Sequence, residues 1–333
     1  MSGVGSEESS TPPSRVTPLA FLDPGDPRFA SVADVRERLG SAGYLADEGI
    51  AGVVHLADRL GKPVLVEGPA GTGKTELAKS VARVTASRLV RLQCYEGLDE
   101  SKALYEWNYR KQLLRIQAEQ VVAPIAGEEP GTPPSGQGRW KVLEEDIFSE
   151  EFLLARPLLE AIRSTDPVVL LVDEVDRLEL ETEALLLEVL SEYQVSIPEL
   201  GTVSATRIPM VFLTSNNTRE LSEALKRRCL YLHLDYPSLE REREIVSERV
   251  PGITTELADQ VARIVRALRG MELKKHPSIS ETLDWARTLV MLGVESVDPD
   301  SARSTLNVLL KYRSDLERAA KELDLVVAGD SPT

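Results

Sequence analysis

Cysteine and histidine are scarce in this chain of 333 residues. Its two cysteines, Cys94 and Cys229, are too few for a disulfide framework, and its three histidines have no metal-ligand spacing. No apolar run approaches the length of about 20 residues that a membrane-spanning helix needs. The N-terminal stretch also lacks a charged-then-apolar secretion signal. These absences lead us to expect a soluble, cytoplasmic protein without a membrane span.

Basic side chains are also fewer than acidic side chains. The chain carries 54 acidic and 39 basic residues, so its formal net charge is −15. Proteins that act mainly on nucleic acid or anionic lipid use an excess of Lys and Arg to bind phosphate groups. The composition therefore disfavours nucleic acid as a partner, although a local basic patch is compatible with it. Apolar residues make up 42% of the chain, which supports a packed interior.

Short apolar runs alternate with helical patterns in the first two thirds of the chain. These runs are Pro63–Val66, Leu89–Leu92, Val168–Val172, Val211–Leu213 and Leu230–Leu234. Continuous apolar strands separated by helices are typical of a parallel sheet that is covered on both faces. We therefore predict an α/β domain over residues 31–236. Within it, residues 195–207 have the pattern of a small hairpin.

Other segments differ in composition from this domain. We expect residues 1–30, which are rich in Ser, Pro and Gly, to form a flexible N-terminal arm. Residues 123–139 have the composition of a mobile Gly/Pro-rich insertion. No strand pattern follows residue 236, so we predict a separate domain of about four helices over residues 237–325. A short tail follows at residues 326–333.

One stretch matches the phosphate-binding pattern GxxxxGK[ST]. It reads Gly68-Pro69-Ala70-Gly71-Thr72-Gly73-Lys74-Thr75. Glycines allow the backbone angles and the close approach by which several N–H groups converge on a polyphosphate. Lys74 would reach the β- and γ-phosphates at the start of a helix, and the Thr75 hydroxyl would bind Mg²⁺. The pattern lies directly between an apolar strand and an amphipathic helix, which favours a phosphate site over a chance glycine-rich turn.

Two adjacent carboxylates, Asp173 and Glu174, follow the apolar run that ends at Val172. The carboxyl ends of parallel strands lie together, so Asp173 would emerge beside the phosphate-binding stretch and help to hold Mg²⁺. Glu174 would then orient and deprotonate a water molecule that attacks the γ-phosphate. An ordinary acidic strand-to-helix turn is the simpler alternative, but its pairing with the phosphate-binding stretch favours the functional interpretation. Together these motifs predict a site that binds and hydrolyses ATP with Mg²⁺.

The order of the motifs resembles that of the AAA+ ATPases. GPAGTGKT is followed by VVLLVDEVD, FLTSNN and LKRRC, and then by the helical segment. Within that family the chain is most similar to the MoxR-type group and its CoxD-like members. The stretches that carry this similarity are GYLADEGIAGVVHLADRLGKPVLVEGPAGTGKTELAKSVA, RLQCYEGLDESKALYEWNYRKQLLRIQ and SISETLDWARTL. The similarity covers roughly Val32 to Val290.

The resemblance implies a five-stranded parallel sheet in the order 5-1-4-3-2, with a helical lid over the nucleotide. It also implies assembly into a ring, usually a hexamer, with ATP held between neighbouring subunits. Asn216 matches a sensor that would contact the γ-phosphate or the attacking water, although it could instead make the turn after its strand. Arg228 matches the arginine finger that is supplied to the neighbour's ATP, with Arg227 as the adjacent alternative. The hairpin at 195–207 matches an insertion that AAA+ rings often point towards their pore.

The chain departs from the MoxR-type pattern at one position. Members of that group typically open the third lid helix with Pro-Arg, and this arginine contacts the γ-phosphate as a second sensor. The corresponding residues here are Ile279 and Ser280, and Ser280 cannot supply a positive charge. Arg287, Lys274 or Lys275 could substitute for it, so the second sensor stays unassigned at this stage.

The function that the resemblance implies is that of an oligomeric, chaperone-like ATPase that remodels or helps to mature a client protein. MoxR-type proteins commonly act with a partner that bears a von Willebrand factor A domain. CoxD-like members are linked to maturation of the metal site of carbon monoxide dehydrogenase. Two alternatives stay open: a nucleic-acid-remodelling motor, which the net charge opposes, and a nucleotide-gated scaffold with little hydrolysis. The intact Asp173, Glu174 and Arg228 disfavour the scaffold, whereas Ser280 favours it.

Overall fold

The computed structural model describes residues 27–121, 144 and 146–328. Most of the predicted N-terminal arm, the whole of the predicted insertion at 123–139 and most of the predicted tail lie outside the described residues. Among the residues that are described, no helix combines the length and the apolar composition needed to cross a lipid bilayer.

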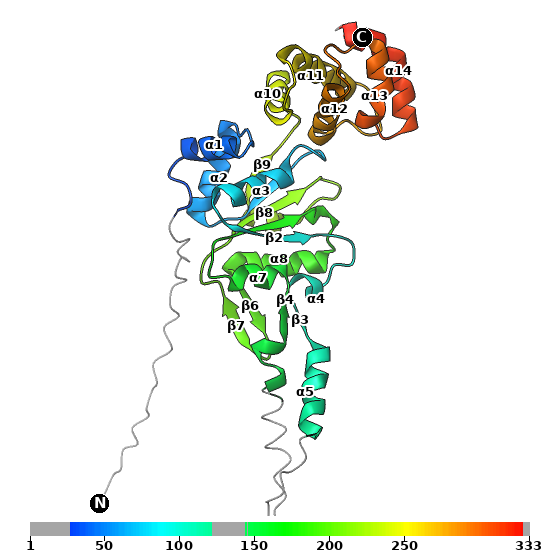
Figure 1. The fold of residues 1–333 in the computed structure, drawn as a ribbon. Helices are drawn as coiled ribbons and strands as arrows, with labels where there is room; N and C mark the ends of the chain where they lie inside the picture. Colours follow the sequence, from blue (N-terminus) through cyan, green and yellow to red (C-terminus); the bar gives the residue numbers. More distant parts are fainter. Residues whose placement is uncertain (1–26, 122–143, 145, 329–333) are drawn as a thin grey trace, which may run out of the picture.

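A parallel sheet of five strands forms the centre of the α/β domain (Figure 1). Its strands are β1 (Val64–Glu67), β2 (Arg88–Gln93), β5 (Val168–Asp173), β8 (Met210–Ser215) and β9 (Leu230–His233). They lie in the order β2-β5-β8-β1-β9, which is the order 5-1-4-3-2 when these five strands are counted along the chain. The predicted fold and strand order are therefore confirmed. β1 pairs on both sides, with Leu65 in register with Leu213 of β8 and Tyr231 of β9.

Successive side chains of the central strands enter two different apolar cores. Leu170 and Val172 of β5 pack on the side of α7 (Pro157–Arg163) and α8 (Leu180–Glu192). The alternate residues of the same strand pack on the side of α1 (Val32–Ser41), α2 (Glu48–Leu60) and α3 (Lys74–Val84), and Figure 1 shows these two helical layers. Because both faces of the sheet are covered, β1, β5 and β8 are buried at every position, as the continuous runs in the sequence indicated, whereas the edge strands β2 and β9 also have exposed residues.

The packed part of the chain begins before residue 31, within the predicted arm. Phe29 is fully buried among side chains of α1 and α2. Arg28 pairs with the buried carboxylate of Asp58, with 3.0 Å between Nη1 and Oδ1. The backbone N–H groups of Arg28 and Phe29 also donate to Asp58 Oδ2, at 2.7 and 3.1 Å. The last residues of the predicted arm are therefore anchored, because a buried carboxylate needs these donors.

Two antiparallel strand pairs extend the α/β domain away from the lid (Figure 1). In the first, β3 (Tyr105–Trp107) pairs with β4 (Leu153–Ala155), close to α4 (Glu100–Ala103), α5 (Tyr109–Val121) and the 3₁₀ helix η1 (Glu150–Phe152). Strands of three residues have no readable alternation, so the sequence did not predict this pair. In the second, β6 (Gln194–Ile197) pairs with β7 (Gly201–Ser204), at the position of the expected hairpin.

The C-terminal domain contains five helices rather than the four expected. They are α10 (Leu239–Arg249), α11 (Thr255–Gly270), α12 (Ile279–Met291), α13 (Pro299–Leu309) and α14 (Arg313–Ala328). The additional break separates α13 from α14 and contains no proline or glycine, so it gave no signal in the sequence. This domain has its own apolar core, with a fully buried Trp285 whose Nε1 donates to Thr305 Oγ1 at 2.8 Å.

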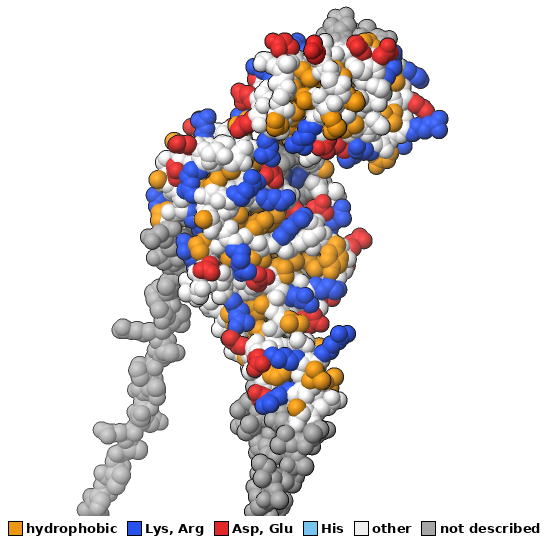
Figure 2. Space-filling model, viewed as in Figure 1, with side chains coloured by type: hydrophobic (Ala, Val, Ile, Leu, Met, Phe, Trp, Pro, Cys, Tyr) orange, Lys and Arg blue, Asp and Glu red, His pale blue; other side chains and the backbone are white. Residues whose placement is uncertain are grey.

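Charged side chains of both signs are mixed on the face of the molecule shown in Figure 2. Lys and Arg side chains alternate there with Asp and Glu side chains, and small apolar areas lie between them. Binding to a nucleic-acid backbone uses a continuous basic surface. The face in this view has no such surface, in line with the net charge of −15.

We expect the substitution Phe29→Ala to destabilise the α/β domain by about 3 to 5 kcal/mol, because it removes a fully buried aromatic side chain. Chemical denaturation followed by tryptophan fluorescence would measure this change. Arg36→Ala on the exposed face of α1 is the control, with an expected effect within about 0.5 kcal/mol. Equal stability of Phe29→Ala and wild type would show that the segment before α1 is not part of the packed domain.

Candidate functional site

The phosphate-binding stretch connects β1 to α3, and two of its glycines are required by close neighbours. At Gly68 the backbone has a φ of +150°, and a Cβ atom there would lie 1.9 Å from the carbonyl oxygen of Leu234. At Gly71 φ is +79°, and a Cβ atom would lie 2.1 Å from Cβ of Ser278 in the lid. The Ile279 N–H donates to the Gly71 carbonyl oxygen at 3.1 Å. The loop is therefore held between β9 and the start of α12.

Lys74 is the first residue of α3 and is 6% exposed. Its Nζ donates to the carbonyl oxygens of Gly68 and Pro69, each at 2.7 Å, so the side chain curls back over the loop. Burial lowers the pKa of Lys74, while the nearby Asp176 and Asp173 act in the opposite direction. An amine that is desolvated and held by neutral carbonyls is well placed to exchange them for phosphate oxygens.

Asp173, at the end of β5, is the most completely coordinated side chain of the site. Its Oδ1 accepts from Thr75 Oγ1 at 2.9 Å and from Thr214 Oγ1 at 2.6 Å. Its Oδ2 accepts from Arg91 Nη2 at 2.6 Å, and the residue is 3% exposed. The adjacent hydroxyl and carboxylate of Thr75 and Asp173 are oxygen donors of the kind that Mg²⁺ prefers, so these two residues fit the predicted metal.

Glu174 follows directly and has a φ of +59°, a left-handed conformation that is uncommon for a residue other than glycine. Its backbone N–H donates to Thr214 Oγ1 at 2.9 Å, which fixes this turn to β8. Its Oε2 accepts from Gln93 Nε2 at 3.2 Å and pairs with Arg177 Nε at 3.0 Å. Two neighbours therefore hold the carboxylate at the edge of the sheet. Such backbone conformations persist where the surroundings enforce them, often at functional sites.

Asn216 follows β8 and is linked to a buried carboxylate that the sequence analysis did not single out. The Asn216 N–H donates to Asp176 Oδ2 at 3.2 Å, and the same oxygen accepts from the Thr218 hydroxyl at 2.6 Å. Burial raises the pKa of Asp176, but the hydrogen bonds from Thr218 and Asn216 outweigh it and hold this pKa below its ordinary value. Asp176 is therefore an anion that anchors the loop carrying Asn216.

Eight of the predicted site residues line a single cavity of about 270 Å³. They are Ala70, Gly71, Gly73, Lys74, Thr75, Asp173, Glu174 and Asn216, and Glu76, Lys79, Thr214 and Ser280 complete the lining. We call this space the phosphate cavity. The strands β1, β5 and β8 end at its edge, which is why residues far apart in the sequence meet there.

Arg228 does not reach the phosphate cavity of its own chain. It ends the short helix α9 (Glu223–Arg228), where its side chain is exposed and Nε donates to the hydroxyl of Ser191 in α8. Arg227 is exposed beside it. A finger supplied to a neighbouring subunit requires an exposed position of this kind.

A second and larger cavity, of about 630 Å³, adjoins the same loop. Gly71, Gly73 and Ser280 line both spaces. The remaining lining comes from the residues before α2, including Tyr44, from the connection between β9 and α10, and from lid helices. A nucleoside attached to phosphates in the first cavity would extend into this space, which we call the nucleoside cavity. No linear motif marks this cavity, because its walls come from four separate segments.

The lid contributes arginines to this region, though not from the expected positions. Arg287 pairs with Asp284 and Lys275 with Glu281, each at 3.1 Å, and Lys274 lies over the ring of Tyr312. These three candidates for the second sensor therefore engage within the lid. The lid cations that line the nucleoside cavity are instead Arg241 and Arg249, both on α10.

The partners of the acidic pair belong to no linear motif and were not predicted. Arg91 and Gln93 lie on β2, which pairs with β5 so that Gln93 is in register with Asp173. Thr214 lies on β8 and bridges Asp173 and Glu174. All three are polar residues on strands that border β5, and their positions within predicted strands were the available signal. Only the strand order reveals that they meet the acidic pair.

Residues 63–229 match the family described as AAA domain (dynein-related subfamily). This span begins just before β1 and ends just after α9, so it contains the whole phosphate cavity apart from Ser280.

The individual proteins that resemble this chain share between 19% and 28% sequence identity with it in the following alignments. The chain is 28% identical over 221 residues to the gas vesicle ATPase GvpN of Haloferax mediterranei, and this alignment covers 63% of the chain and 57% of GvpN. The chain thus spans little more than half of that relative's length. An uncharacterised protein of Staphylococcus haemolyticus is 22% identical over 254 residues, which are 74% of this chain and 83% of that protein. A mutant of Thermotoga maritima RuvB superposes with a TM-score of 0.43 at 19% identity, over 84% of this chain and 71% of that one.

We expect Arg91→Gln to lower the Mg²⁺ concentration needed for half-maximal nucleotide binding, because Arg91 competes for the Asp173 carboxylate. Arg91 is 47% exposed, so screening limits the effect to roughly two- to five-fold. Titration of Mg²⁺ against a fluorescent nucleotide would measure it. Arg88→Gln, on the same strand and paired with Glu160 instead, is the control. A weaker Mg²⁺ response in Arg91→Gln would mean that the arginine orients Asp173 rather than competing for it.

Proposed function

The chain belongs to the AAA domain family, dynein-related subfamily, and on this basis we propose that it binds and hydrolyses ATP with Mg²⁺. The observation that carries the proposal is the convergence of Lys74, Thr75, Asp173, Glu174 and Asn216 on one cavity. Each of these side chains has a chemical task in hydrolysis of a triphosphate, and together they supply a cation, metal ligands, a base and a hydrogen-bond donor.

In the bound state the backbone N–H groups of the glycine loop and the start of α3 would surround the phosphates. Lys74 would turn from the carbonyl groups of Gly68 and Pro69 to the β- and γ-phosphates. Thr75 and Asp173 would hold Mg²⁺, whose charge offsets that of the phosphates. The base and ribose would occupy the nucleoside cavity beside Tyr44 and Arg241.

For the chemical step, Glu174 would accept the proton of the attacking water. Gln93 and Arg177 both contact Oε2 of this carboxylate, so Oε1 is the oxygen that would accept the proton. Asn216 would donate a hydrogen bond to the γ-phosphate or to the water. The buried Asp176 fixes the backbone of Asn216 and so limits where its side chain can point.

We also propose that the active form is a ring, with a hexamer as the expected assembly, in which Arg228 acts on the neighbour's nucleotide. The exposed position of Arg228, away from its own phosphate cavity, supports this assignment. A fixed positive charge that arrives from another subunit would stabilise the charge that develops in the transition state. Hydrolysis would then depend on assembly.

We further propose a process for which the protein would use ATP hydrolysis. The sequence similarity to MoxR-type and CoxD-like proteins supports remodelling or maturation of a client protein, with a von Willebrand factor A domain protein as a candidate partner. The hairpin of β6 and β7 lies at the end of the α/β domain away from the lid (Figure 1), and β7 is largely exposed there, which suits contact with such a client. The mixed charges on the visible face favour a protein client over nucleic acid.

We expect Glu174→Gln to bind ATP with near-normal affinity and to lose hydrolysis by at least about 100-fold, because an amide cannot accept the proton. Equilibrium binding and phosphate release would be measured on the same sample. Lys74→Ala, which should lose binding itself, is the reference, and Glu188→Gln on the exposed face of α8 is the matched control. Normal turnover by Glu174→Gln would disprove the assignment of the base.

We expect Arg228→Ala to bind ATP but not to hydrolyse it, because its phosphate cavity is intact while the neighbour's finger is missing. Mixing it with Glu174→Gln subunits, whose fingers are intact, should restore part of the activity. Phosphate release as a function of the mixing ratio would measure this recovery. Activity that never exceeds the sum of the separate variants would argue against a finger that acts between subunits.

A further inference from the structure

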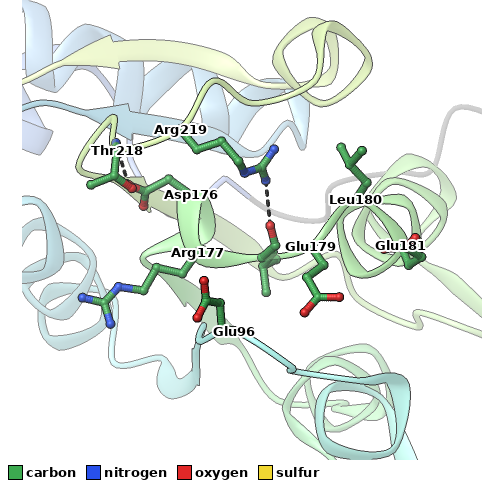
Figure 3. A pocket seen from close by; sticks show the side chains of 9 residues that line it. Glu96, Asp176, Arg177, Glu179, Leu180, Glu181, Thr218 and Arg219 are labelled. Carbon is green, nitrogen blue, oxygen red and sulfur yellow. Dashed lines mark hydrogen bonds between the residues drawn. The ribbon is translucent and has the colours of Figure 1, made fainter.

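A separate cleft borders the loop that carries Asn216, since Thr218 forms part of its lining. Its volume is about 700 Å³, and Figure 3 shows the side chains that line it. They are Glu96, Asp176, Arg177, Leu178, Glu179, Leu180, Glu181, Thr218 and Arg219. The two arginines are already engaged, Arg177 with Glu174 and Arg219 with Glu183. The four carboxylates of the lining have no ion-pair partner in the described part of the chain, so the cleft is acidic.

Asp176 forms the buried part of this lining and is 3% exposed. Its Oδ2 accepts three hydrogen bonds, from the N–H groups of Asn216 and Thr218 and from the Thr218 hydroxyl. Its Oδ1 is equally buried but has no hydrogen-bond partner among the described residues. A buried charged oxygen without a hydrogen-bond donor destabilises the folded protein. The residue that forms the inner wall of the cleft therefore carries an anionic oxygen without a donor among the described residues.

A guanidinium group matches this lining in charge and in donor number. It carries five N–H donors in one plane and can serve several carboxylates at once. Leu178 and Leu180 provide apolar contact for the methylene groups of an arginine side chain, and Leu180 is 66% exposed. A metal ion fits less well, because the described residues include no cluster of three or more His, Cys, Asp or Glu side chains that could hold one.

This chain carries such a donor on the last turn of α9, where three basic residues follow one another. Lys226 pairs with Glu220 at 3.2 Å, and Arg228 donates to Ser191. Arg227 is exposed and makes no ion pair or hydrogen bond within the ranges that the structure describes. A second copy of the chain could therefore offer Arg227 without breaking any described interaction.

We propose that the acidic cleft binds Arg227 of a second copy of this chain. The inference rests on the proposed ring, in which the adjacent Arg228 reaches the phosphate cavity. The two targets are adjacent as well: Asn216 borders the phosphate cavity and Thr218 borders the cleft. Two consecutive arginines of one subunit thus meet two adjoining sites of the next. Because the donor helix and the cleft are different surfaces, the contact is heterologous and can repeat around a closed ring.

The contact would also connect assembly to the nucleotide. Arg227 would supply the donor for Asp176 Oδ1, while Asp176 Oδ2 continues to hold the Asn216 backbone. A neighbour that docks correctly would then fix the position of Asn216 as well as deliver Arg228. Arg227 is in this sense a positioning residue, because it would act on the γ-phosphate only through Asp176 and Asn216.

A charge-swap experiment with full-length protein tests the inference. Arg227→Glu and the double variant Glu179→Lys/Glu181→Lys should each weaken self-association at least about ten-fold, because each places like charges together. Mixing the two variants should restore association, because the glutamate then meets the lysines and the native arginine meets a native cleft. Sedimentation velocity with ATP and Mg²⁺ would measure it. Asp176 is left unchanged because it holds the loop together.

The control is Arg59→Glu, which makes the same charge change at an exposed position on α2 and should associate like wild type. Wild-type association by Arg227→Glu, or no gain on mixing, would overturn the inference. Nucleotide binding, measured on the same samples, distinguishes this failure from failure of the proposed function, since variants that bind ATP but show no recovery refute only the cleft contact. Binding of the peptide Ac-Ala-Arg-Ala-NH₂ to the cleft, with association unaffected by Arg227→Glu, would assign the cleft to another chain and overturn the second copy as its occupant.

Discussion

The carboxylate of Asp173 is the constraint on which the whole site depends. It accepts from Thr75 at the start of α3, from Thr214 on β8 and from Arg91 on β2, and it is itself carried by β5. One buried side chain therefore joins three strands to the phosphate-binding loop. Since a buried carboxylate is stable only when its oxygens are satisfied, the two hydroxyl donors Thr75 and Thr214 help the sheet edge to keep its shape. The position of Glu174 follows, because Thr214 also binds its backbone N–H.

The fold was largely predictable because its signals are local. A continuous apolar run such as Val168–Val172 indicates a strand covered on both faces, and the strand β5 observed there has every residue buried. The order of the strands came from the resemblance to a family. Short elements were missed where no local signal exists: β3 and β4 have three residues each, and the break between α13 and α14 contains neither proline nor glycine.

The site was predictable only for residues that belong to a linear motif. Gly68 to Thr75 and the pair Asp173-Glu174 could be found because each chemical task requires a fixed residue type at a fixed spacing. Arg91, Asp176 and Tyr44 have no such spacing. Their roles depend on which strands and helices become neighbours, and this information lies in the tertiary structure. The same is true of the lid, where the arginines beside the nucleoside cavity come from α10, whereas the sequence had directed attention to α12 and its flanking lysines.

The division of apolar side chains into separate cores bears on how the molecule responds to heat. The helical domain has a core of its own around Trp285, whereas the two cores of the α/β domain share the central sheet. Domains with independent cores can melt as independent cooperative units. The nucleoside cavity draws its walls from both domains, so a ligand bound there stabilises the two together by mass action. A calorimetric trace with two transitions for the free protein would therefore merge towards one as ligand is added.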